Sequence, residues 1–162
     1  MLKLPLLEIV LRGIPEEFLL IFAMYAFSKT AINIKRYIIS SIFMIILIYL
    51  IRLLPIQFGV HTIIGLIASI VLTVNINKIP IIKSIQASII AMIVETISEG
   101  INIFMIKYIF KLDVNYVFNE PILKILYGIP SLLIFGIVVT LCYLRTFRNR
   151  GLRDVINGEV SQ

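Results

Sequence analysis

Apolar stretches of membrane-spanning length recur five times along the 162 residues of this chain. Crossing about 30 Å of hydrocarbon takes roughly 20 residues of α-helix. The stretches lie at residues 4–27, 37–54, 59–74, 81–110 and 122–144. With only short connections between them, this pattern predicts an all-α, polytopic integral membrane protein with about five transmembrane helices. We expect one transmembrane domain over residues 1–144 and a short basic and polar tail over 145–162.

The composition supports a membrane protein and excludes several other classes. Hydrophobic residues make up 60% of the chain and charged residues only 15%, whereas a soluble domain is nearer half and a quarter. The net charge of +6 comes from residues that flank apolar runs, so the lipid bilayer is the expected partner and nucleic acid is not. One Cys (Cys142) and one His (His61) predict neither an internal disulfide nor a metal site or cofactor. No catalytic motif is recognisable, so we expect no enzyme.

Lysine and arginine are biased towards one side of the predicted membrane. Basic residues in short loops favour the cytoplasmic side. They follow the first, third and fifth spans, at Lys29, Lys35, Arg36, Lys78, Lys83, Arg145, Arg148, Arg150 and Arg153. The opposite side carries mixed charge. This predicts an outer N-terminus and an inner C-terminus in a cell membrane.

The first span contains an unusual charged segment, "LEIVLRGIPEEF" at residues 7–18. Two structures fit it. In one, a single helix runs over residues 4–27 with a kink at Pro15, and Glu8, Arg12 and Glu16 share one face. In the other, a short helix ends at Arg12 with Gly13 as its cap, and Pro15 opens a second helix that continues towards Ile34.

The other ionisable groups outside the cytoplasmic flanks fall mainly in the outer half of the predicted bundle. Glu95, Glu99 and Asn102 follow one another at helical spacing on the fourth span, and we expect Arg12 to pair with Glu95 or Glu99 because an unpaired charge in hydrocarbon is costly. The candidate ligand-binding residues are Glu8, Arg12, Glu16, Arg52, His61, Glu95, Glu99 and Asn102. Three interpretations stay open: an ion-pair network that fixes helix packing, a hydrated cavity that receives a ligand from outside, and a proton or ion path through Glu95.

Two further patterns concern helix packing. Small residues at intervals of four, including Gly65 with Ser69 on the third span and Ser84 with Ser88 on the fourth, allow close approach of other helices, within the chain or in a dimer. Gly128 and Pro130 predict a kink near the outer end of the fifth span, where the Ser131 hydroxyl is placed to satisfy a freed backbone group.

Three segments resemble the membrane-sensor regions of peptide-sensing histidine kinases from Gram-positive bacteria: "YLIRLLPIQFGVHTIIGLI", "TVNINKIPIIKSI" and "KILYGIPSLLIFG". The resemblance implies a sensing role. In such a kinase the dimerisation and ATP-binding part would follow the fifth span, whereas this sequence ends at Gln162. Kinase activity is therefore not implied.

The leading hypothesis is a non-enzymatic, receptor-like or regulatory membrane protein. It would bind an extracellular peptide or small ligand in an outer polar pocket and signal through a membrane or cytoplasmic partner protein, or as a homo-oligomer. The alternatives are a substrate-binding membrane subunit of a transporter and a structural accessory subunit.

Overall fold

The computed structural model describes residues 9–53 and 58–159, and every regular element within them is a helix. The all-α prediction is therefore confirmed. The elements in chain order are a π-helix η1 (Ile9–Gly13), α2 (Ile14–Phe27), α3 (Ile34–Leu53), α4 (Phe58–Asn75), α5 (Ile81–Tyr108), α6 (Val114–Asn119) and α7 (Pro121–Glu159).

Three of these helices contain segments long and apolar enough to cross a membrane, namely Ile34–Ile51, Ile81–Tyr108 and Ile122–Arg148. Two more apolar helices are shorter: α2, and the Val60–Asn75 part of α4. Large apolar side chains such as Ile46, Ile97 and Leu133 stand about half exposed on the long helices. Exposed apolar surface on this scale is unfavourable in water and suits contact with lipid.

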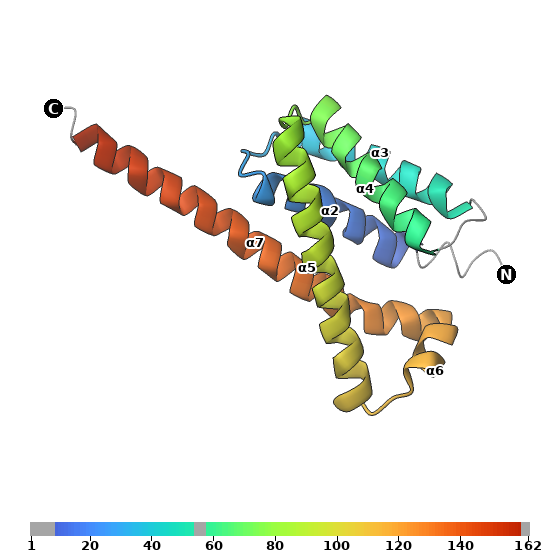
Figure 1. Cartoon of the computed structure of the whole chain (residues 1–162). Helices are drawn as coiled ribbons and strands as arrows, with labels where there is room; N and C mark the ends of the chain where they lie inside the picture. Colours follow the sequence, from blue (N-terminus) through green and yellow to red (C-terminus); the bar gives the residue numbers. More distant parts are fainter. Residues whose placement is uncertain (1–8, 54–57, 160–162) are drawn as a thin grey trace.

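Helix α2 lies at the centre of the bundle and packs against α3, α5 and α7 (Figure 1). On one side Ile21 and Tyr25 of α2 join a buried cluster with Met44 of α3 and Leu72 of α4. On the other side a second cluster joins α2 to α5 and α7 and contains Ala23, Ala26, Ala91, Phe135 and Val139. The three alanines let the helix backbones approach closely, as small residues do in membrane bundles.

Close helix approach is present at both small-residue patterns. Ser69, Ser84 and Ser88 are buried, and Gly65 lies against Ile48 of α3. The hydroxyl groups of Thr73 and Ser84 lie 2.6 Å apart and share a hydrogen bond. A hydrogen bond between small hydroxyls suits an interface from which water is excluded.

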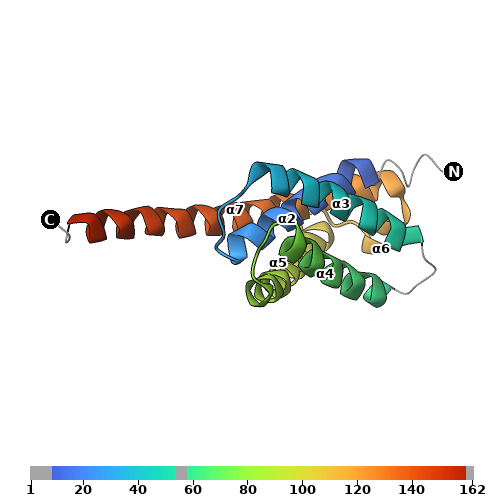
Figure 2. The same ribbon diagram turned by 90° about the horizontal axis from the view of Figure 1, so that it is seen from above.

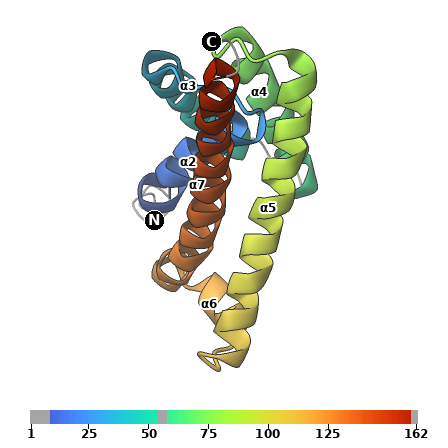
Figure 3. The same cartoon turned by 90° about the vertical axis from the view of Figure 1, so that its left-hand side faces the viewer.

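The last helix, α7, continues past Leu144 to Glu159, beyond the expected end of the fifth span. It bends in its first part, which contains Pro130, and then extends well outside the bundle (Figure 1). Seen from above, this extension stands apart from the packed helices (Figure 2). Figure 3 shows α5 and α7 side by side, with α6 joining them at one end.

The first helix combines features of both structures expected from the sequence. Gly13 has helical backbone angles (φ −63°, ψ −44°), so the chain passes from η1 into α2 without a left-handed cap. The wider π-turn lies where Pro15 cannot donate to the carbonyl of Leu11. Pro15 does occupy the first turn of α2, but α2 ends at Phe27 and does not continue to Ile34. Residues 4–8 of the predicted span lie outside the described residues.

Three lysines occupy the left-handed backbone region where glycine is usually found: Lys29, Lys78 and Lys111, with φ of 56°, 58° and 53°. Each follows the end of a helix. A side chain in this conformation costs roughly 1–2 kcal/mol, but a positive charge there interacts well with the helix C-terminus. At Lys29 and Lys78 the same charge also contributes to the predicted orientation in the membrane.

We expect Lys78→Gly to stabilise the fold by about 1 kcal/mol, because glycine adopts the left-handed conformation without strain. The melting temperature in nanodiscs should rise by about 2–4 °C. Lys83→Gly is the matched control: it removes one charge from the same region, but it places glycine inside α5 and should cost about 0.5–1 kcal/mol. Equal melting temperatures for the two variants would contradict the strain at Lys78.

Candidate functional site

Arg12 is the centre of the charged region. Its Nη2 donates to Oε1 of Glu99 on α5 at 2.9 Å, and its Nε lies 3.9 Å from Oε2 of Glu16, one turn further along the first helix. The side chains of Arg12 and Glu16 are mostly buried, at 15% and 16% exposed, whereas Glu99 is 48% exposed. The predicted pairing of Arg12 with Glu95 or Glu99 is confirmed for Glu99.

Gly128 provides the space in which the Arg12 side chain lies. A Cβ atom added at Gly128 would be 3.2 Å from Nη1 of Arg12 and 3.3 Å from its Cδ and Cζ. Those distances are shorter than ordinary contacts, so a larger residue on α7 would displace the guanidinium. Gly128 therefore allows Arg12 to reach Glu99 across the face of α7.

Asn102 binds the backbone of α7 near its proline. Its Nδ2 donates to the carbonyl of Tyr127 at 2.6 Å, and the residue is only 6% exposed. Pro130 removes the helical hydrogen bond to the carbonyl of residue 126, so the carbonyl groups near the bend need other donors. The Ser131 hydroxyl donates to the carbonyl of Gly128 at 2.7 Å, whereas the carbonyl that loses its helical donor at Pro130 is that of residue 126.

Additional carboxyl groups lie on the α2–α5 side of Arg12. Glu95, on α5, lies within hydrogen-bonding reach of Glu16 and within electrostatic range of Glu17 and Glu99. Glu17 is 6% exposed. Arg12 therefore provides positive charge to a region rich in carboxyl groups. Its removal should raise the electrostatic energy of the neighbouring carboxyl groups as well as that of Glu99.

A pocket of about 180 Å³ opens beside the Arg12–Glu99 pair. Its wall combines two cations, one carboxylate, neutral polar groups and an apolar surface. The lining residues are Arg12, Glu99, Asn102, Ile103, Ile106, Val117, Lys124, Tyr127, Gly128 and Ser131.

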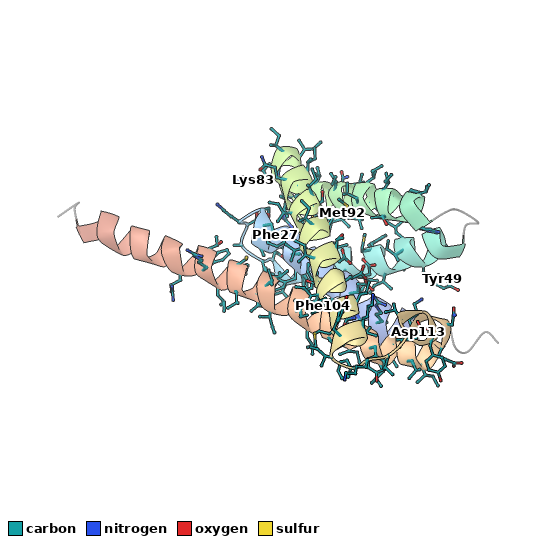
Figure 4. All side chains as sticks on the ribbon, turned by 60° about the horizontal axis from the view of Figure 1, so that its bottom comes forward. Phe27, Tyr49, Lys83, Met92, Phe104 and Asp113 are labelled. Atoms are coloured by element: carbon teal, nitrogen blue, oxygen red, sulfur yellow. The ribbon has the colours of Figure 1, made fainter. Side chains whose placement is uncertain are left out.

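The pocket lies where the end of α5, the start of α7, the short helix α6 and η1 meet. Figure 4 labels Lys83 at the start of α5 and Asp113 in the connection after its end, at opposite ends of the helix. The pocket is at the Asp113 end. The basic connections that contain Lys29 and Lys78 precede α3 and α5, so they belong to the Lys83 end.

The structure brings together some of the candidate residues. Arg12, Glu99 and Asn102 line the pocket. Glu16 does not line it but lies 3.9 Å from Arg12. Glu95 lies beside Glu16 without lining the pocket, and His61 is on α4, also away from the lining residues. Glu8 lies outside the described residues, and Arg52 ends α3 in a stretch whose side chains are not described.

Sequence reasoning missed the contribution of α6 and α7 to the pocket. Lys124, Tyr127 and Val117 were not among the candidates. Lys124 carried a usable signal, because it is a charged residue just inside the end of a predicted span. Nothing in the sequence marked Val117, whose place depends on how α6 folds back against α5 and α7.

Among the described side chains, no group of three or more His, Cys, Asp and Glu residues is arranged to hold a metal ion. Comparison with protein-family models, curated proteins and solved structures gives no match to this chain.

Proposed function

We propose that this chain is a non-enzymatic, receptor-like membrane protein of the cell membrane, with five membrane-crossing helices, an outer N-terminus and an inner C-terminus. It binds a small extracellular ligand in the pocket beside Arg12 and Glu99. The observation that carries this proposal is the pocket itself, with charges of both signs at the end of the bundle remote from the basic connections.

The pocket supports a binding role over a purely structural ion pair. A pair that only fixed helix packing would be expected to be covered by protein on all sides, yet the Glu99 side chain is about half exposed and lines the pocket. The core at the other end combines a buried apolar cluster around Met44, Leu72 and Ile79 with small polar groups, and its buried residues in the described part of the chain carry no charge. A core without buried charges favours a receptor over a transporter subunit, which needs a polar path through the bundle.

Helix α7 offers a physical connection between the pocket and a partner protein. Its first turns line the pocket at Lys124 and Tyr127, and the same helix continues outside the bundle to Glu159. The extension carries Arg148 and further arginines at positions 150 and 153. A partner protein at this basic inner face would receive the signal, in keeping with the resemblance to sensor regions of peptide-sensing kinases.

Single-cysteine labelling tests the orientation and the access to the pocket. In a Cys142→Ser background, we expect a membrane-impermeant maleimide to label Lys124→Cys and Asn115→Cys in intact cells, because both positions face outwards. Thr30→Cys, in the connection after α2, should be labelled only after the membrane is permeabilised. Labelling of position 30 alone in intact cells would reverse the orientation and remove the extracellular pocket.

A further inference from the structure

The size of the pocket limits what it can hold. The volume of the pocket is about 180 Å³. Pockets for drug-sized ligands start near 300 Å³. The space therefore suits a small molecule, such as one of the smallest amino acids, and a peptide of several residues would extend out of it.

The charges in the wall limit the ligand further. Arg12 and Lys124 are cations, and Glu99 is the carboxylate that lines the same pocket. A simple anion would compete with Glu99 for Arg12, and a simple cation would face two positive side chains. A molecule that carries both charges finds a partner for each, and charge-assisted hydrogen bonds are the strong ones.

Glu99 retains room for a second interaction. It accepts from Arg12 through Oε1, and about half of its side chain stays exposed. An ammonium group can therefore approach the carboxylate without displacing Arg12. Opposite the charges, Ile103, Ile106 and Val117 give the pocket an apolar wall, which suits a small aliphatic group.

Resting on the function proposed above, we infer that the pocket binds a small zwitterion, with its ammonium group at Glu99 and its anionic group at Lys124 and Arg12. Two sources offer this chemistry: a free amino acid with a small side chain, and the phosphoethanolamine headgroup of a lipid. Both place an ammonium and an anionic group a few bonds apart. A peptide terminus carries only one of the two charges.

The test uses the full chain in phosphatidylglycerol nanodiscs, which contain no zwitterionic lipid. L-alanine is titrated while the melting temperature and the heat of binding are recorded. Propionate and L-alaninamide, which keep the anion or the cation alone, should bind about tenfold or more weakly, because each lacks one charge-assisted contact. Trialanine carries both charges but holds them several bonds further apart, so it should bind weakly because of this separation and because of its size.

Variants identify the site. Glu99→Gln and Lys124→Gln should each weaken alanine binding about tenfold or more, while Lys124→Arg keeps the charge and should retain part of it. Lys111→Gln is the matched control, since Lys111 does not line the pocket. Circular dichroism checks that each variant is folded. If Lys124→Gln does not fold, Lys124→Arg still tests the inference.

A second set of nanodiscs contains phosphatidylethanolamine and no free amino acid. Stabilisation by this lipid that is lost in Glu99→Gln and Lys124→Gln would assign the zwitterion to the headgroup. Equal binding of propionate or alaninamide, or no response to alanine and to the lipid, would overturn the inference. If Lys124→Cys is still labelled from outside in that case, the outward pocket stands and only the ligand class is wrong.

Discussion

Arg12→Met should destabilise the protein by about 3 kcal/mol, and the melting temperature in nanodiscs should fall by about 6–12 °C. The guanidinium is mostly buried and holds Glu99 at 2.9 Å. Methionine fills a similar volume but leaves Glu16, Glu95 and Glu99 near one another without their cation. Glu99 is half exposed, but Glu16 is mostly buried, and leaving a mostly buried carboxylate without its cation costs far more than the intact pair contributes.

A double-mutant cycle separates the charge from the packing of Arg12. Arg12→Met combined with Glu99→Gln removes the charges of this pair and should recover only part of the loss, because Glu99 is then neutral while Glu16 still lacks its cation. Arg12→Lys should lie between the wild type and Arg12→Met, since lysine keeps the charge but not the planar fork. An unchanged melting temperature in Arg12→Met would mean that water already screens these charges.

The Arg12–Glu99 pair was predictable from the sequence because few charges interrupt the apolar spans. A charged side chain in hydrocarbon needs an oppositely charged partner. Arg12 on the first predicted span had two candidate partners on the fourth, Glu95 and Glu99. The choice of Glu99 over Glu95 was not predictable. It depends on the π-turn before Pro15 and on the space at Gly128, which together set how far along α5 the guanidinium reaches.

The helices themselves followed from hydrophobicity and length, but the pocket did not. Apolar runs predict helices wherever the backbone must satisfy its own hydrogen bonds, and all the described elements are helical. The pocket instead depends on α6, a helix of 6 residues, and on the bend in α7. Short helices are set by tertiary contacts, and Pro130 predicts a bend without fixing its direction, so Val117 and Tyr127 had no sequence signal of their own.

Asn102→Leu should cost about 2 kcal/mol, because it removes the donor to the Tyr127 carbonyl and leaves that carbonyl in a poorly hydrated place. The bond is short, at 2.6 Å, and Asn102 is 6% exposed. Leucine keeps the branched outline of asparagine, but its methyl groups are larger than the amide atoms, so crowding adds to the cost. The measurement is the melting temperature in nanodiscs, with Ser131→Ala as the control, since its bond to Gly128 lies within one helix and should contribute less.

The size of this effect should depend on Pro130. Pro130→Ala restores a backbone donor, so a straightened α7 would satisfy its carbonyl groups within the helix. We therefore expect Asn102→Leu to cost less in the Pro130→Ala background than in the wild type, with a coupling of about 1 kcal/mol. Equal costs in the two backgrounds would show that Asn102 does not compensate for the bend. A positive coupling would show that Asn102 links the pocket to the bend in α7. Asn102 lines the pocket and binds the Tyr127 carbonyl of α7.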